Sequence, residues 1–359
     1  MRFLFKTDYD LDIRLFPHGG AVFWYAVLGG LLLLAPWLIG EYWLSQLGFV
    51  AIYGIAGIGL MLLAGYTGQI SLGHAAFFAV GAYAETILLA RGWPFPLALP
   101  AAGLLAAVVG IGIGLPALRL AGIYLAIATL AFAFIVEEIL ARWESVTNGN
   151  NGLSVPPIAI GPVEFISTGA LFYYLVLAVL AVVILAAINL LRSPTGRAFV
   201  AIRDSEIAAQ SMGVHLAWYK TVAFALSAGF TGIAGAFYAH KLQFISPEAF
   251  TILLSIELLV MVVVGGLGSL HGAIFGAIFI IVLPEVIGVV KDYLPGYVAN
   301  QPGLRALLFG LIIIGFMLFE PLGLYGRWRK IKLYFALFPF YRRGTFRRQR
   351  AYLKTERLR

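Results

Sequence analysis

The chain of 359 residues contains no cysteine, so disulfide bonds, thiol catalysis and cysteine metal sites are excluded. Charged residues are also scarce, at 12% of the sequence, whereas apolar residues make up 61%. A water-soluble domain of this length could not bury so much apolar surface. The composition therefore indicates a protein that is solvated largely by lipid, in agreement with its mean hydropathy of +0.93.

Several functional motifs are missing as well. The sequence has no GxxxxGK[ST] phosphate-binding loop, so we do not expect this chain to bind ATP. It has no nucleophile–base–orienter motif, and we expect no enzymatic activity. His74 and His271 lack metal-ligating residues at a suitable spacing, which favours structural hydrogen bonds over metal binding. Residues 1–16 contain no apolar run followed by a small-residue cleavage site, so a cleavable signal peptide is not expected.

Long apolar segments recur along the chain. A hydrocarbon core about 30 Å thick requires roughly 20 apolar residues per helix. By this measure the sequence predicts an all-α, polytopic membrane protein with about ten transmembrane helices, some of them broken. The expected segments are 22–39, 46–64, 74–90, 96–115, 121–140, 170–191, 219–239, 250–265, 270–290 and 303–320.

Lysine and arginine are distributed unevenly over the loops between these segments. If all ten cross the membrane, one face holds twenty of the 25 basic residues, counting the N-terminus, Arg119, residues 192–220 and the C-terminal tail. The positive-inside rule places that face, and with it both termini, in the cytoplasm. On the opposite face, residues 142–166 are rich in Asn, Gly and Pro and are expected to form an irregular loop.

These boundaries predict three parts. A cytoplasmic N-terminal segment covers residues 1–21, a transmembrane domain covers 22–323, and a basic cytoplasmic tail covers 324–359. The tail adjoins a predicted span, which favours contact with anionic membrane lipid over nucleic acid.

Residues 192–220 form a polar island between two apolar segments. Ile202, Ile207 and Met212 recur at helical spacing among its charged residues, which predicts one or two short amphipathic helices at a membrane face. Such an island is either a solvated connector or a docking element for another protein.

Two segments at 65–78 and 265–268 interrupt apolar sequence with glycine and polar residues. Irregular backbone at membrane depth must be buried in protein or line a cavity. In transporters such interruptions often mark the substrate path, although a short cytoplasmic turn is the alternative for 65–78. Glu257 lies deep in an apolar segment, where a carboxylate is expected to be a gate or a structural polar contact.

Three segments together resemble the permeases of branched-chain amino acid ABC importers. They are the sequence GYTGQISLGHAAFFAVGAYAE at 65–85, residues 252–277, and the polar island. The resemblance covers about residues 45–323, and the long charged N-terminus is similar to that of the M-type subunit. Glu85 departs from the pattern, which has a small or neutral residue there, and this leaves urea or short amides open as substrates.

The resemblance implies a permease subunit in a bacterial cytoplasmic (inner) membrane. It would import leucine, isoleucine and valine, and would form the translocation path together with a second permease subunit. Two ATP-binding cassette ATPases would bind the ATP, and an external solute-binding protein would deliver the substrate. No cofactor and no nucleic acid are expected in this chain. An ion-coupled secondary transporter, with Glu257 or Glu85 as the ion-binding carboxylate, is the alternative from another class.

The resemblance also implies two sets of site residues. Residues 192–218 would be the cytoplasmic loop that couples the permease to the ATPase, with a short helix that ends at a glycine. Its small residues would fit a cleft on the ATPase, and its charged residues would orient the docking. The coupling residues are Arg203, Asp204, Glu206, Ala208, Ala209 and Gly213. The candidates for the translocation path are Gly68, Gln69, Ser71, Gly73, His74, Glu257, Gly265 and Gly266.

Overall fold

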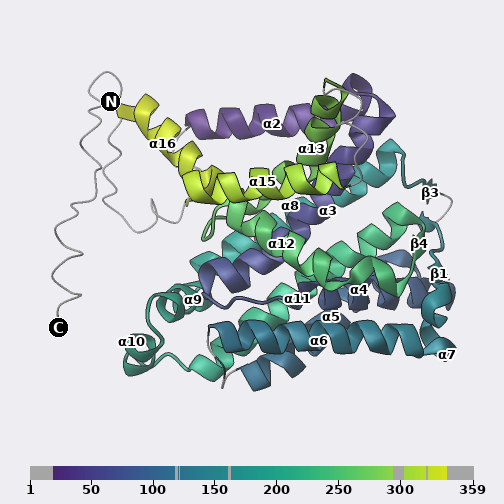
Figure 1. The fold of residues 1–359 in the computed structure, drawn as a ribbon, viewed down its shortest axis with the longest axis horizontal. Helices are drawn as coiled ribbons and strands as arrows, with labels where there is room; N and C mark the ends of the chain where they lie inside the picture. Colours follow the sequence, from purple (N-terminus) through teal and green to yellow (C-terminus); the bar gives the residue numbers. More distant parts are fainter. Residues whose placement is uncertain are drawn as a thin grey trace.

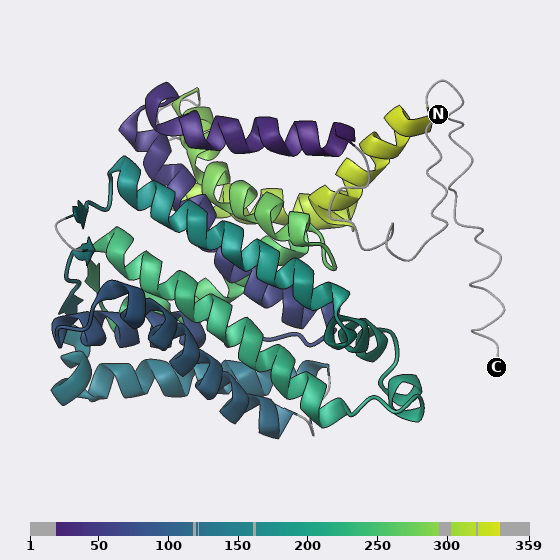
Figure 2. The same ribbon diagram turned by 180° about the vertical axis from the view of Figure 1, so that it is seen from behind.

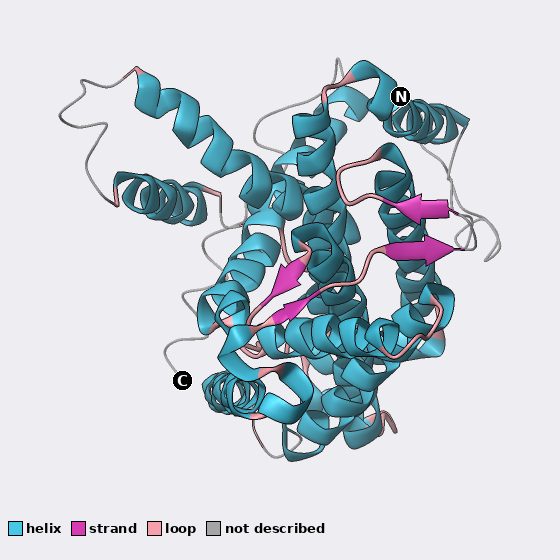
Figure 3. Ribbon diagram, turned by 90° about the vertical axis from the view of Figure 1, so that its right-hand side faces the viewer, coloured by secondary structure: helices cyan, strands magenta, loops and turns pink. Residues whose placement is uncertain are grey.

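The computed structural model describes residues 19–117, 120, 122–160, 163–293, 303–320 and 322–337. Most of the predicted N-terminal segment, Arg119 and the tail beyond residue 337 lie outside these ranges. Helices dominate the described chain, and its few strands are short (Figure 3). The all-α prediction is therefore confirmed.

The first part of the chain consists of helices joined by short connections. In chain order these are α2 (Gly19–Leu38), α3 (Glu41–Leu60), the π-helix η1 (Met61–Tyr66), α4 (His74–Ala90), α5 (Phe95–Ala117) and α6 (Ile123–Arg142). η1 continues α3 directly, and the two together run from Glu41 to Tyr66. The second part contains α8 (Ala170–Arg192), α9 (Pro194–Asp204), α10 (Glu206–Ser211), α11 (Leu216–Leu242), η3 (Pro247–Phe250), α12 (Ile252–Gly265), α13 (Leu270–Asp292), α15 (Leu304–Phe319) and α16 (Gly323–Leu337).

The segment expected to be an irregular loop is more ordered than its composition predicts. It contains α7 (Glu144–Thr147), η2 (Gly149–Asn151), β1 (Leu153–Ser154), β2 (Ile158–Ile160) and β3 (Val163–Phe165). β2 pairs with β3, and β1 pairs antiparallel with β4 (Phe244–Ile245), which follows α11. The β1–β4 pairing is formed with a strand distant in sequence, so the local composition could not indicate it.

Every predicted apolar segment is helical, but the predicted count of ten membrane spans is not confirmed. Among the residues that the structure describes, seven helical segments are long and apolar enough to cross a membrane. The count rises to eight if α15 and α16, which are bent by 48° relative to each other, form one span. Two apolar helices within the described residues, Val22–Leu38 and His74–Ala90, are shorter than this criterion requires. α4 is short because the residues before His74 form a non-helical segment.

The core is built around α3. Its residues from Ala51 onward are buried without interruption, as expected of a helix that is apolar on all sides and enclosed by other helices. α8, α11, α12 and α13 pack against it. α2, α15 and α16 lie along one side of this core, and α5 and α6 lie along the other (Figure 1).

The two ends of the bundle differ in character. α9, α10 and α16 lie at one end, and the start of α2 lies there too (Figures 1 and 2). α7, β1 and β4 lie at the opposite end. α6, α8 and α11 run between the two ends (Figure 2). The helical polar island and the strand-bearing loop thus lie on opposite faces, as the alternation of spans and loops predicted.

Glycine allows α11 to lie very close to α4. A Cβ atom on Gly81 of α4 would overlap the backbone of Gly232 in α11. In the same way, a Cβ atom on Gly235 of α11 would overlap the backbone of Phe78 in α4. Small residues serve this purpose in membrane proteins, where helix association depends on close van der Waals packing rather than on burial from water.

We therefore expect Gly81→Val to destabilise the protein by ~1–3 kcal/mol, because the new side chain must force the two backbones apart. Gly112→Val is the matched control, since a Cβ atom on Gly112 meets no other atom within 4 Å. Thermal unfolding of the two variants in detergent tests the prediction. Equal melting temperatures would show that the α4–α11 contact tolerates a larger separation.

Candidate functional site

The first helix break follows η1 and runs from Thr67 to Gly73. The Thr67 hydroxyl donates to the Leu63 carbonyl oxygen at 2.5 Å, and the Gln69 backbone N–H donates to the same oxygen at 3.1 Å. The Gln69 side-chain amide donates to the Thr67 hydroxyl at 3.0 Å. Gly68 has a φ of +71°, a conformation that favours glycine. The break is therefore an ordered turn in which the Thr67 hydroxyl and the Gln69 N–H bond a carbonyl group at the end of the helix.

His74 begins α4 and is completely buried. Its Nδ1 atom lies 3.0 Å from the Ser71 hydroxyl, and its Nε2 atom lies 2.8 Å from the hydroxyl of Ser227 in α11. Both ring nitrogens thus have hydrogen-bond partners inside the protein, as predicted. Among the residues that the structure describes, no group of three or more potential ligands could hold a metal ion.

Hydroxyl groups from two further helices bond the backbone of this break. The Leu72 N–H donates to the hydroxyl of Thr129 in α6 at 2.9 Å, and the Ala75 N–H donates to the hydroxyl of Ser255 in α12 at 2.9 Å. Gly73 is buried, and a Cβ atom on it would lie 2.6 Å from the Thr129 carbonyl oxygen. A larger residue at Gly73 would therefore press on the backbone of α6 before it could fill an open path.

The second break lies between α12 and α13. α12 ends at Gly265, Gly266 has a φ of +113°, and a Cβ atom on Gly265 would overlap the carbonyl group of Gly272. This break lies against the first one, since a Cβ atom on Gly65 would come within 2.7 Å of the Gly268 nitrogen. The Gly268 N–H donates to the sulfur of Met61 in η1 at 3.2 Å. The structure thus brings together the two glycine segments that the sequence singled out separately.

Glu257 lies on α12 and is partly buried. The described part of the chain offers its carboxylate no hydrogen bond, but Tyr53 of α3 and Tyr238 of α11 are within electrostatic range. These tyrosines belong to an aromatic cluster with Phe78 and Phe250, in which ring centroids are 5.1 to 6.4 Å apart. The cluster was not predicted, because its members come from α3, α4, α11 and η3.

Glu85 has a partner that the sequence did not indicate. Its side chain in α4 is completely buried, and Oε2 lies 2.8 Å from Nε2 of His240 in α11, which is also buried. The two atoms are within ion-pair distance but are not aligned for a hydrogen bond. This pairing accounts for a carboxylate where the family pattern has a small or neutral residue, so Glu85 no longer argues for a different substrate.

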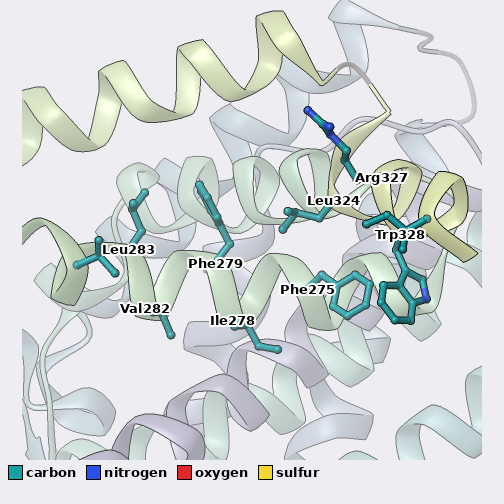
Figure 4. Close-up of a pocket in the computed structure, with 10 residues that line it drawn as sticks. Phe275, Ile278, Phe279, Val282, Leu283, Leu324, Arg327 and Trp328 are labelled. Atoms are coloured by element: carbon teal, nitrogen blue, oxygen red, sulfur yellow. The ribbon is translucent and has the colours of Figure 1, made fainter. Parts of the chain in front are cut away.

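Hollows in the structure include a cavity with polar walls and an apolar groove. A cavity of about 270 Å³ lies at the strand-bearing end, where Ser154, Ser167, His240 and Gln243 contribute polar groups to its wall. An apolar groove of about 510 Å³ lies between α13 and α16 (Figure 4). None of the candidate path residues lines this groove, which makes it a poor candidate for the translocation path.

The predicted coupling loop contains two capped helices. Pro194 occupies the first turn of α9, and the Ser193 hydroxyl accepts a hydrogen bond from the Gly196 N–H at 3.4 Å. The Ser205 hydroxyl caps α10 by accepting from the Ala208 N–H at 3.2 Å. Gly213 follows α10 with a φ of +85°, so the prediction of a short helix that ends at a left-handed glycine is confirmed.

The outward surface of α10 differs in part from the predicted docking set. Ala208 is exposed, but Ala209 is only 3% exposed and packs against its own chain. Ile207 and Met212, which were not among the predicted coupling residues, are each 84% exposed. Glu206 turns toward α11, where its carboxylate lies 2.7 Å from the buried Lys220 ammonium group. The exposed surface at α10 therefore includes two large apolar side chains, Ile207 and Met212, while the charged Glu206 holds the helix against α11.

Arg203 and Asp204 end α9 and contact each other. Arg203 donates to Asp204 Oδ1 from Nε at 3.1 Å and from Nη2 at 3.0 Å. The Arg203 Nη1 atom donates to the Gly65 carbonyl oxygen at 3.3 Å. One member of the predicted coupling set thus reaches the first helix break.

Comparison with known proteins adds an independent line of information. A family model described as the permease component of branched-chain amino acid transport systems matches residues 42–317. The high-affinity branched-chain amino acid transport system permease protein LivM of Escherichia coli K12 is 36% identical over 324 residues, which cover 83% of this chain and 74% of that protein. LivM of Salmonella typhimurium is 35% identical over 313 residues, with coverages of 80% and 71%. The autoinducer 2 import system permease protein LsrC of Salmonella typhimurium is 26% identical over 249 residues, with 65% of each chain covered. No solved structure gives a significant match.

The buried Glu85–His240 pair gives a prediction about stability. Glu85→Ala or His240→Ala leaves the other polar group buried without its partner, and each variant should lose about 3–5 kcal/mol of stability. The double variant should lose less than the sum of the single losses, because it removes both polar groups. Thermal unfolding of the four proteins in detergent measures the coupling. Strictly additive losses would mean that the two groups do not interact.

Proposed function

The chain belongs to the family of permease components of branched-chain amino acid transport systems, and from this premise we propose that it forms the translocation path of an ATP-driven importer for leucine, isoleucine and valine. The family assignment confirms the resemblance predicted from the sequence. The chain is accordingly a permease subunit of an ABC importer and not an enzyme. The single observation that supports the proposed substrates best is the 36% identity to LivM over most of both chains.

The proposed assembly has the partners that such an importer needs. The end that carries α9 and α10 would face the cytoplasm and dock on one of two ATP-binding cassette ATPases, which bind the ATP. The opposite end, with its strand-bearing loop, would receive an external solute-binding protein. A second permease subunit would complete the path. The start of α2 and the helix α16 lie at the proposed cytoplasmic end, which supports cytoplasmic termini in a bacterial inner membrane (Figure 2).

For the membrane domain we propose ten crossings. α4 is short for a span, but the break at 67–73 precedes it and extends its segment across part of the bilayer, and α2 covers 20 residues from Gly19 to Leu38. Interrupted helices of this kind occur where transporters line a substrate path. The domain would run from residue 22 to 323, with the coupling loop at 192–218 and the basic tail at 324–359.

The interior suits an aliphatic amino acid. The carboxylate of Glu257 would attract the ammonium group of a passing substrate, and the neighbouring aromatic cluster would contact its side chain. Near the first break, the buried Gln69 Oε1 atom has no hydrogen-bond partner in the described residues and offers another acceptor. Gly65 and Gly265 allow the backbone to approach closely there, so this region could change shape between outward and inward access.

Transport of leucine by the reconstituted complex tests the proposal. Proteoliposomes that contain this chain, the second permease and the ATPases should accumulate leucine only when ATP and the binding protein are supplied. Isoleucine and valine should compete, whereas urea should not. ATP dependence should persist in Glu257→Gln, with weaker uptake, because this variant keeps the side-chain shape but loses the charge.

Two outcomes would contradict the proposal. Uptake that continues without ATP but stops when an ionophore collapses the ion gradients would identify an ion-coupled transporter, particularly if Glu257→Gln changed the ion dependence. Competition by urea, with no effect of isoleucine or valine, would identify a urea or amide importer.

Two exposed apolar residues, Ile207 of α10 and Met212 directly after it, give a prediction about docking. Replacing both Ile207 and Met212 by serine should weaken binding of the ATPase by roughly tenfold or more, since each loses apolar area that a partner would bury. Gln210→Ala, an exposed change on the same helix, is the control. Co-purification at graded salt and detergent concentrations measures the retained ATPase. Equal retention in the two variants would exclude Ile207 and Met212 from the docking surface.

A further inference from the structure

The side chain of Arg203 lies in a corner formed by Gly65 at the end of η1 and by Gly68 and Gly268 of the two helix breaks. Its Nη1 atom donates to the carbonyl oxygen of Gly65 at 3.3 Å. A Cβ atom on Gly68 would lie 3.2 Å from the Arg203 Cγ atom, and one on Gly268 would lie 3.3 Å from Nη1. The absence of side chains at Gly68 and Gly268 leaves the room that the arginine occupies.

Asp204 holds the guanidinium group in this orientation. It accepts from Nε and Nη2, which leaves Nη1 directed at the end of η1. The side chains of Arg203 and Asp204 are 37% and 66% exposed, so their ion pair contributes little to the free energy of folding. Its consequence is geometric, because it fixes the direction in which the arginine reaches.

Both breaks are also connected to the same π-helix. Gly65 belongs to η1, and the Gly268 N–H is bonded to Met61 of η1 at 3.2 Å. π-helical turns are frequent at functional sites and are less regular than α-helix. A displacement of Arg203 would therefore act on the end of η1 and, through the contacts at Gly268, on the break between α12 and α13.

The backbone at Arg203 is connected to the docking helix α10 through the end of α9. A single residue, Ser205, separates α9 from α10 and caps α10 with its hydroxyl. Because the connection is so short, a movement of α10 shifts the end of α9, where Arg203 lies.

We propose that Arg203 is a positioning residue that transmits the movement of α10 to both helix breaks, rather than a residue that contacts the ATPase. The inference rests on the proposed function, and it assigns to Arg203 a different role from the docking role expected from sequence. Removing the side chain should leave the ATPase bound but separate its hydrolysis from transport.

The test compares Arg203→Ala with Arg197→Ala in the complete complex. Arg197 is the matched control, since it is an exposed arginine of the same helix that donates to the Arg192 carbonyl oxygen at 3.1 Å, away from both breaks. Arg203→Ala should retain the ATPase like the wild type and lower the leucine taken up per ATP hydrolysed by roughly tenfold. Arg203→Lys, which keeps a donor for Gly65 but lacks the fork that Asp204 binds, should restore part of the ratio. Arg197→Ala should behave like the wild type.

A distance measurement tests the transmission directly. The natural chain has no cysteine, so spin labels can be attached at introduced cysteines without background. Gln210 on α10 and Leu267 at the second break are exposed positions, and Val182 on α8 is an exposed reference. With a non-hydrolysable ATP analogue, both the 182–210 and the 182–267 distances should change in the wild type. In Arg203→Ala the first should still change and the second should not.

Three results would overturn the inference. Loss of the ATPase from Arg203→Ala would make the residue a docking contact. If Arg203→Ala and Arg197→Ala took up equal amounts of leucine per ATP hydrolysed, the Arg203–Asp204 pair would have no role in coupling. A 182–267 distance that still changes in Arg203→Ala would show that another route carries the movement. If the wild-type complex failed to transport leucine, the proposed substrate would be wrong, whereas the distance measurements would still decide the role of Arg203.

Discussion

The constraint on which this structure depends is the need to bond the backbone wherever a helix stops inside the bundle. Backbone N–H and C=O groups that are enclosed by other helices cannot be left unpaired, so other parts of the protein must bond those of residues 67–73. Leu63 receives hydrogen bonds from Thr67 and Gln69, and hydroxyls of α6 and α12 accept from Leu72 and Ala75. These bonds determine which helices surround the first break, and they make an interrupted helix compatible with a buried position.

Close packing around the breaks then connects distant parts of the chain. Glycine at 65 and 268 brings the first break against the second, and the space left at Gly68 accommodates Arg203 from the polar island. The same principle lets α4 and α11 approach closely enough for Glu85 and His240 to meet. Small residues thus allow two sets of contacts. One links the breaks to α9, and the other is the buried Glu85–His240 pair near the opposite end.

The two ends of the helix bundle differ in the side chains and elements that they present. Ile207 of α10 and Met212 after it expose apolar side chains at one end, and strand pairs and a polar cavity lie at the other. Between them lie the breaks, Glu257 and the aromatic cluster. This arrangement suits a permease, because a movement that starts at one face must open or close the access of the substrate from both faces.

The helical segments, the position of both breaks and the short helix of the coupling loop could be predicted from the sequence alone. These features depend on local properties, namely apolar runs, glycine, and capping residues such as Ser205 and Gly213. The sequence did not determine the number of spans that meet the length criterion, because the break before His74 shortens α4. Three features follow from the packing of the helices instead: Arg203 faces the breaks, Ala209 is buried while Ile207 is exposed, and Glu85 pairs with His240. The reason is physical: each of these depends on how helices far apart in the chain pack together, and a local pattern does not specify which face of a short helix meets its neighbour.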